Sequence, residues 1–238
     1  MRVFPRMALR RLQKIMDDSH YSSTTARFLV LIIAVVALLP STGCIHQILA
    51  TGIYFFQGGN TMPAECHALR EKRVVVVCRP PSSHEYRHAG ASREIAKQVS
   101  RNLSQNVKKI DVVDPREVDN WIDESDWDDW KDLAKAVKAD MVLYIELESF
   151  ELFKGKTLYQ GNSDITISVY DMTDGDDLVW DKYLGEVLYP QNSGIPVQDK
   201  PLQHFRREFV ENVSKQISLY FHAHDPHAMF ALDALANR

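Results

Sequence analysis

Apolar and polar residues are arranged along the middle of the chain in the way that β-strands require. The runs that carry this signal are residues 141–147, 165–170, 178–180 and 183–189. The first run is almost continuously apolar, which predicts a strand buried on both faces. In the second run apolar and polar residues alternate, which predicts a strand with one exposed face. Asp174 and Gly175 form a strong turn signal before the third run. We therefore predict an antiparallel meander.

The chain before the meander predicts a strand–helix–strand unit. Residues 74–77 are four consecutive valines, as in a central buried strand. In residues 91–109 an apolar side chain recurs at every fourth position, which predicts an amphipathic helix of about five turns. Residues 110–113 form another short apolar run, which predicts a second strand.

Capping signals predict two helices between this unit and the meander, and periodicity predicts a third helix after it. Asp114 followed by Pro115 is typical of an N-cap with proline at the first helical position. Asp126 is a second candidate N-cap, and residues 202–221 carry one apolar stripe. We predict an α/β domain at residues 72–222, built on a single mixed sheet (strand–helix–strand followed by an antiparallel meander) that is flanked by helices.

The N-terminal region predicts a signal peptide over residues 1–43. Residues 28–39 are an uninterrupted apolar run, too short for a bilayer span of about 20 residues but suited to the apolar core of a signal peptide. Six basic residues precede the run against two acidic ones. Because this basic region is long, Met7 and Met16 stay open as alternative starts.

Residues 40–44, Pro-Ser-Thr-Gly-Cys, resemble a bacterial lipobox, in which the cysteine is diacylated and becomes the mature N-terminus. Ser41 departs from the motif, which usually has Leu there. The resemblance implies lipid on Cys44, cleavage after Gly43, and a membrane-anchored tether over residues 44–71. Ile45, in place of the Asp associated with inner-membrane retention, favours the outer membrane. An uncleaved signal anchor and a soluble cytoplasmic protein are the alternatives.

The charge balance argues against one class of partner, and the cysteine content leaves two redox states open. Of 28 basic and 32 acidic residues, 22 basic and 30 acidic lie from Cys44 onward, a formal charge of −8. Nucleic-acid binding needs a clustered basic face, so this balance argues against it. Cys66 and Cys78 are an even pair that would form either a disulfide in an oxidising compartment or two free buried thiols.

One motif points to metal chemistry. His84, Glu85 and His88 spell His-Glu-x-x-His, the pattern in which two histidines one helical turn apart bind zinc while the glutamate activates water. This chemistry needs an established helix, whereas the motif follows two prolines closely. We therefore favour a solvated loop, or at best a frayed first turn of a helix, and keep a zinc-dependent hydrolase as the alternative function.

Three other clusters have simpler structural interpretations. His222, His224 and His227 indicate either a metal-binding tract or a polar segment of a C-terminal tail at 223–238. The acidic residues between 114 and 129 lack the spacing of a calcium loop, so we interpret them as helix caps and a solvated face. Their aromatic neighbours anchor helices to the sheet or form a partner surface: Trp121, Trp127 and Trp130.

No catalytic set emerges from the remaining sequence, and we predict no enzyme activity and no cofactor. Glycine-rich phosphate loops, Gly-x-Ser-x-Gly and paired Cys-x-x-Cys motifs are missing from the sequence. A periplasmic small-ligand-binding protein stays open, because no residue pattern reports on pockets. A homo-oligomer also stays open.

Two segments resemble a family of bacterial envelope lipoproteins. Residues 136–144, AVKADMVLY, resemble that family's junction of helix, Ala-Asp and apolar strand, and residues 170–180 resemble its Tyr-Asp, turn glycine and Trp hairpin. The family includes the curli-secretion lipoprotein, the penicillin-binding-protein activator lipoprotein and the amino-terminal domain of the Tol–Pal translocation protein. The resemblance implies a non-catalytic α/β domain that faces the periplasm, tethered by lipid and acting as an assembly, scaffolding or regulatory partner. The pair of membrane-inserting hairpins of the curli-secretion members is not evident.

Overall fold

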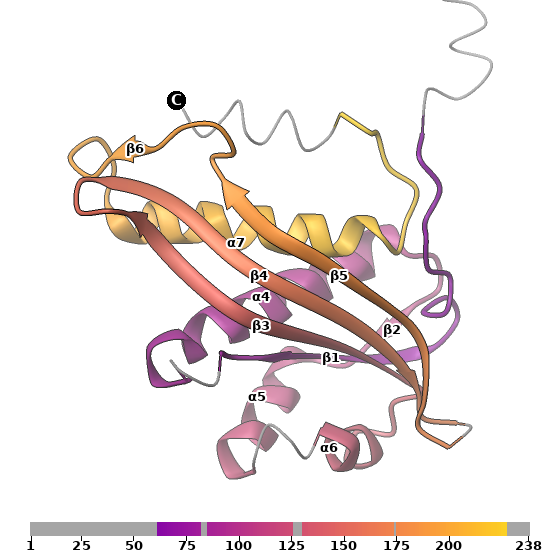
Figure 1. The fold of residues 1–238 in the computed structure, drawn as a ribbon. Helices are drawn as coiled ribbons and strands as arrows, with labels where there is room; N and C mark the ends of the chain where they lie inside the picture. Colours follow the sequence, from indigo (N-terminus) through magenta and orange to yellow (C-terminus); the bar gives the residue numbers. More distant parts are fainter. Residues whose placement is uncertain (1–60, 82–84, 126–129, 174, 228–238) are drawn as a thin grey trace, which may run out of the picture. The chain divides into compact units, whose positions relative to one another are not determined.

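A computed structural model describes residues 61–81, 85–125, 130–173 and 175–227, and at 85–89 it describes the backbone only (Figure 1). All these residues belong to one compact unit, Asn60–Arg238. The predicted signal peptide and the first part of the tether lie outside the described residues. No helix within the described ranges is both long enough and apolar enough to cross a membrane.

The order of the elements is the predicted one, with one short strand added. In chain order they are β1 (Arg73–Arg79), α4 (Glu85–Asn106), β2 (Asp111–Val112), α5 (Pro115–Glu124), α6 (Trp130–Ala136), β3 (Met141–Lys154), β4 (Leu158–Asp171), β5 (Asp177–Tyr189), β6 (Ile195–Pro196) and α7 (Leu202–Leu219). The third and fourth strand runs of the sequence are one continuous strand, β5.

The prediction of a single mixed sheet is confirmed. The strand order is β2-β1-β3-β4-β5, with β6 paired to β4. β1 is parallel to both of its neighbours, and its Val74 is level with Met141 of β3. β3, β4 and β5 form the antiparallel meander, in which Leu143 of β3 is level with Val169 of β4. Parallel neighbours require a crossover, and α4, α5 and α6 supply the two crossovers.

Helices α4 and α7 cover the inner face of the sheet (Figure 1). The predicted apolar stripes form this contact: Ile95, Val99 and Leu103 of α4 are fully buried, and so are Phe205 and Phe209 of α7. They pack against the inward side chains of the strands in one hydrophobic core. Burial of these side chains removes apolar surface from water and fixes both helices on the sheet.

Helices α5 and α6 cover the β1–β3 part of the opposite, outer face and the Tyr170 end of β4 (Figure 1). Val75 and Val142 point into this second core, while Val74 and Leu143 point into the first. The continuous apolar runs of β1 and β3 therefore follow from burial on both faces, as predicted. The outer face of the meander beyond this region has no helix over it in the described part of the chain.

The predicted cap of α5 is confirmed, whereas the start of α4 lies earlier than predicted. The Asp114 carboxylate accepts a hydrogen bond from the Arg116 backbone N–H at 2.9 Å, and Pro115 occupies the first turn. α4 begins at Glu85 rather than at residue 91, because Gly90 lies inside the helix instead of interrupting it. α6 begins at Trp130, and its proposed cap, Asp126, lies outside the described residues.

The folded domain extends beyond both predicted boundaries, 72 and 222. Leu69 is 1% exposed and belongs to the inner core. Met62 and His224 exchange two backbone hydrogen bonds, of 2.8 and 3.0 Å, and the Cys66 N–H donates to the Tyr220 carbonyl at 2.9 Å. We call residues 61–69 the strap. Part of the predicted tether therefore belongs to the domain, since these contacts hold it against the end of α7.

Candidate interaction surface

The structure places few of the chemically suggestive residues together. Cys44 and His84 lie outside the described residues. The His-Glu-x-x-His motif lies at the start of a helix rather than wholly in a loop, because the backbone of Glu85 and His88 forms the first turn of α4. The helix begins after His84. Among residues with described side chains, no three His, Cys, Asp or Glu are placed to hold a metal ion.

The C-terminal histidines make backbone contacts with their own segment. His222 Nδ1 lies 3.0 Å from the Ala223 carbonyl, and His224 Nδ1 lies 3.1 Å from the His222 carbonyl. His224 also pairs with the strap through its backbone. The segment that carries these histidines is polar, as one interpretation predicted, and two backbone hydrogen bonds hold His224 to Met62.

The acidic segment after residue 113 serves local structure. Asp114 caps α5, and Asp119 and Asp123 form ion pairs with Arg93 of α4, the first at 3.9 Å. Burial raises the pKa of Asp119, and the positive charge of Arg93 opposes that rise. These pairs join α5 to α4. Asp126, Asp128 and Asp129 lie outside the described residues.

Two of the three tryptophans, Trp121 and Trp130, anchor helices to the sheet, which was one of the two interpretations of the sequence. The Trp130 ring of α6 lies 4.5 Å from the Tyr170 ring and 5.6 Å from the Tyr144 ring, measured between centroids. Trp121 of α5 packs on the same outer core. Trp127 lies outside the described residues.

Both described cysteines are free buried thiols rather than a disulfide. Cys78 is 1% exposed at the end of β1, and burial raises the pKa of its thiol far above the ordinary range. Burial also raises the pKa of the Cys66 thiol in the strap. A raised pKa keeps a thiol protonated and unreactive, so neither cysteine has the properties of a nucleophile.

Strand β5 leaves one long edge of the sheet open. In the described part of the chain β5 pairs only with β4, so the backbone groups on its other side have no protein partner between residues 178 and 188. This strand also carries three large apolar side chains that are exposed to solvent. Their exposed fractions are 51% for Leu178, 46% for Val179 and 60% for Tyr183. An open edge of this kind is a template for another strand.

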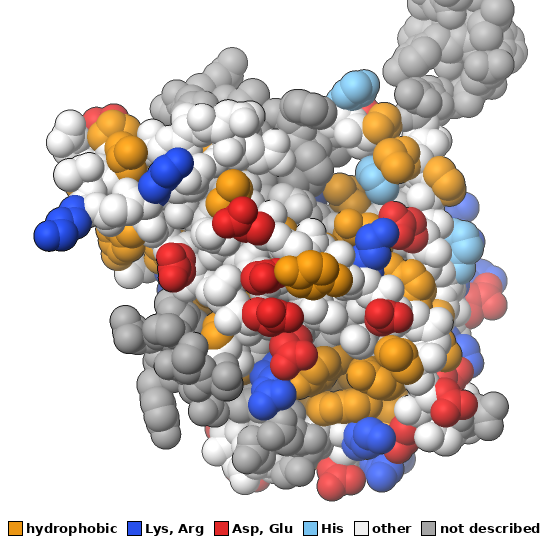
Figure 2. Space-filling view, in the orientation of Figure 1, with side chains coloured by type: hydrophobic (Ala, Val, Ile, Leu, Met, Phe, Trp, Pro, Cys, Tyr) orange, Lys and Arg blue, Asp and Glu red, His pale blue; other side chains and the backbone are white. Residues whose placement is uncertain are grey.

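The outer face beside this edge is acidic. Figure 2 shows acidic side chains gathered over the meander, next to an apolar patch. The pairing register brings them together from three strands, because Asp164 of β4 is level with Glu186 of β5, and Ser168 is level with Asp181. Glu148 of β3 accepts a hydrogen bond from Thr166 on the same face.

Three of these carboxylates, Glu148, Asp164 and Glu186, accept hydrogen bonds from polar side chains. Tyr183 Oη donates to Asp164 Oδ2 at 3.1 Å, and this hydrogen bond raises the pKa of the tyrosine. Asn162 donates to Glu186 at 2.7 Å. Among the described residues, none of the four carboxylates (Glu148, Asp164, Asp181, Glu186) is in an ion pair. We call these four residues with Tyr183 the acidic face. Its charge is therefore unneutralised within the described domain.

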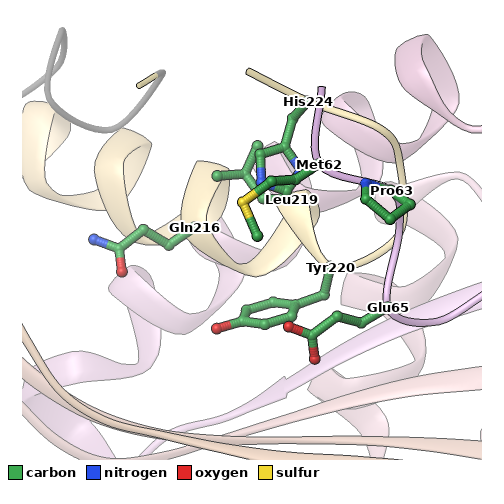
Figure 3. Close-up of a pocket in the computed structure, with 7 residues that line it drawn as sticks. All are labelled: Met62, Pro63, Glu65, Gln216, Leu219, Tyr220 and His224. Carbon is green, nitrogen blue, oxygen red and sulfur yellow. The ribbon is translucent and has the colours of Figure 1, made fainter. Parts of the chain in front are cut away.

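A cavity of about 190 Å³ lies where the strap meets the end of α7 (Figure 3). Its lining residues are Met62, Pro63, Glu65, Gln216, Leu219, Tyr220 and His224. The Glu65 carboxylate already pairs with Lys182 of β5 at 3.0 Å, and this bond raises the pKa of Lys182. Lys182 also lies 5.4 Å from the centre of the Tyr220 ring. Glu65, which lines the cavity, thus holds the strap to β5 through its ion pair with Lys182.

Comparisons with known proteins give no family assignment. No model of a known family and no curated protein matches this sequence. Solved structures with partial likeness include a PelC dodecamer from Paraburkholderia phytofirmans (13% identity, TM-score 0.41, 68% of this chain and 97% of that chain). Lipoprotein GNA1162 from Neisseria meningitidis gives 14% identity and a TM-score of 0.41 over 61% of this chain and 97% of that one.

A third structure, the hypothetical protein CT253 from Chlamydia trachomatis, gives 12% identity and a TM-score of 0.34 over 62% of this chain and 96% of that one. Likenesses at this level carry no argument about the present chain. The resemblance to envelope lipoproteins therefore stays a prediction from the sequence.

The acidic face could not have been predicted from the sequence alone. Its carboxylates come from β3, β4 and β5, and no two of them are neighbours in the sequence. The alternation in β4 indicates which of its side chains face outward. Only the pairing register and the place of β5 at the edge bring the set together.

Proposed function

We propose that this protein is a membrane-tethered, non-catalytic lipoprotein of a bacterial envelope. Lipid on Cys44 would hold it, and the domain would act by contact with another envelope component, as an assembly, scaffolding or regulatory partner. The observation that supports a contact role is the open edge of β5, because a long edge strand with exposed apolar side chains is a ready surface for another polypeptide.

The anchor is supported by the sequence before the domain. The apolar run at 28–39 is followed by Gly43-Cys44, and residues 45–60 then lead to the strap. A fully extended stretch of this length reaches at most roughly 55 Å. Two acyl chains on one cysteine give stable membrane attachment, whereas a single chain gives only reversible binding. The proposal therefore assigns the N-terminal region to attachment and the domain to recognition.

Intact mass of the protein extracted from membranes tests this function. The expected mass corresponds to a chain that starts at Cys44 and carries acyl groups, and Cys44→Ala is expected to lose both the cleavage and the lipid. Cys66→Ala is the matched control, because Cys66 is a buried thiol inside the domain and should leave the modification intact. An unmodified full-length mass for the unaltered protein would refute the lipoprotein assignment.

A further inference from the structure

The edge of β5 offers backbone groups along a strand of 13 residues. Natural sheets commonly protect such an edge with charged side chains, bulges or a covering helix. Two bulges do occur in β5, where the register with β4 leaves Val179 and Leu184 as extra residues. They leave Leu178, Val179 and Tyr183 exposed, and no described helix covers the edge. The edge is therefore available for pairing.

The side chains of β5 specify what a neighbouring strand would meet. On the outer side Asp181, Tyr183 and Glu186 are exposed. On the inner side Trp180 and Leu184 are partly buried against the core, and Lys182 between them is already paired with Glu65 of the strap. Residues opposite each other on adjacent strands lie about 4.5–5.5 Å apart at Cβ, so an added strand would place alternate side chains beside acidic and apolar neighbours. The fitting pattern is an alternation of basic and apolar residues.

Charge argues against two other occupants of this edge. A second copy of the chain paired through β5 would bring two acidic faces side by side, and like charges on neighbouring strands are destabilising. An anionic membrane surface would be repelled by the same carboxylates. Opposite charge favours a basic segment, and long-range attraction would also speed its association.

We propose that β5 accepts an extended segment of another polypeptide in which basic and apolar residues alternate. The segment pairs with the open edge by β-strand addition, and its basic side chains lie against the acidic face. This inference deepens the proposed function, since it names the surface and the chemistry of the partner. Backbone hydrogen bonds supply affinity in this mode of recognition, and alternate side chains supply selectivity.

Fluorescence anisotropy with synthetic peptides tests the inference on the full-length protein in non-ionic detergent. The probe is a labelled ten-residue peptide of alternating lysine and valine. The double variant Asp181→Asn with Glu186→Gln is expected to weaken binding about five- to ten-fold, because two opposite-charge contacts are lost. The matched control, Glu124→Gln with Glu211→Gln, removes two exposed carboxylates elsewhere and is expected to leave the affinity unchanged. Circular dichroism establishes that both variants are folded.

A second peptide separates strand pairing from simple charge attraction. Methylation of alternate backbone nitrogens removes the donors on one edge of the peptide and keeps its charge. Loss of binding on methylation supports strand addition. Equal binding of the methylated peptide, equal binding of an alternating glutamate–valine peptide, or an unchanged affinity of the β5 variant would each overturn the inference. Self-association through the edge, detected as a disulfide between two Tyr183→Cys copies, would overturn it too.

The same titration with Cys44→Ala separates this inference from the proposed function. Binding by this variant as tight as that of the unaltered protein is expected, because the edge lies in the domain. If the mass measurement shows no lipid while the peptide binds, the anchor fails and the inference holds. If lipid is present and the peptide does not bind, the inference alone fails.

Discussion

Gly161 in β4 marks the closest approach between the sheet and α7. A Cβ built at this position would lie 2.5 Å from carbons of the Phe209 ring, closer than real contacts allow. Phe209 belongs to an aromatic group on this side of the sheet, in which its ring lies 5.1 Å from that of Phe150 and 6.5 Å from that of Tyr189. The missing side chain is therefore what allows α7 to lie so close to the sheet.

Gly161→Ala is expected to destabilise the domain by about 1–3 kcal/mol, because the added methyl group must push a fully buried ring out of a packed core. Gly90→Ala is the matched control. Its Cβ would meet only the end of the Arg206 side chain, at 3.3 Å, and alanine in a helix is favoured over glycine by about 0.5–1 kcal/mol. Urea unfolding measures both. Equal stability of the two variants would contradict this account of the packing.

The Cys78 thiol makes stability depend on alkaline pH. In the folded protein burial keeps the thiol protonated, whereas in the unfolded chain it ionises near its ordinary pKa of 9.0. The folded state therefore holds more protons above about pH 9, and the free energy of unfolding falls as pH rises further. Below about pH 9 the thiol is protonated in both the folded and the unfolded state, so it does not make the free energy of unfolding depend on pH.

Replacement of Cys78 by alanine is expected to flatten this fall by up to about 1.4 kcal/mol per pH unit. Urea unfolding at a series of pH values from about 7 to 10 measures the slope for both proteins. The comparison of slopes avoids the constant cost of the smaller side chain. Parallel pH profiles would mean that the thiol ionises in the folded state and that Cys78 is not sealed from water.

Single residues differ in how much the sequence reveals about them. The burial of Cys78 was foreseeable, since it directly follows four consecutive valines, a run typical of a strand that is buried on both faces. The role of Gly161 was not, because a glycine in a strand pattern does not state which distant ring approaches it. Cys44 lies outside the described residues, so its assignment still rests on the sequence.

At the scale of elements, α5 depends on its N-cap. Asp114→Ala is expected to lower the free energy of unfolding by about 1 kcal/mol, because the Arg116 N–H loses its acceptor at the end of the helix. Asp114→Asn is the matched control, since asparagine keeps an oxygen at the same place and is an equally good cap. Thermal unfolding followed by circular dichroism compares the three proteins. Equal losses in both variants would point to charge rather than capping.

Helices and strands were predictable where their apolar residues repeat with a single regular spacing. The periodicity of the meander and of α7 led to the correct elements, and Asp114-Pro115 marked the start of α5. Gly90 misled the prediction of α4, because tertiary packing outweighs the modest cost of one glycine in a helix. The order of the strands in the sheet was harder to predict than the strands themselves. Nothing in the alternation of residues 178–189 states that β5 lies at the edge, and the acidic face depends on that position.

At the scale of the whole molecule, the strap joins the entry of the chain to the end of the last helix. Leu69 fills a place in the inner core, Met62 pairs with His224, and Glu65 reaches Lys182 of β5. These contacts link residues more than 100 positions apart in the sequence. Any pull that reaches the domain through its N-terminal end therefore acts on α7 and β5, where the open edge lies.

A chain that begins at residue 72 is expected to be less stable than one that begins at residue 61 by at least about 2 kcal/mol. Removal of Leu69 leaves a hole in a packed core, which costs about 2–5 kcal/mol for a leucine, and three backbone hydrogen bonds are lost as well. Urea unfolding of the two chains measures the difference.

Leu69→Ala in the longer chain should reproduce most of the loss. Glu65→Ala should cost less than about 1 kcal/mol, because its ion pair with Lys182 is solvent-exposed. Equal stability of the two chains would show that the domain begins at residue 72, as the sequence alone suggested, and that the strap contributes nothing to the core.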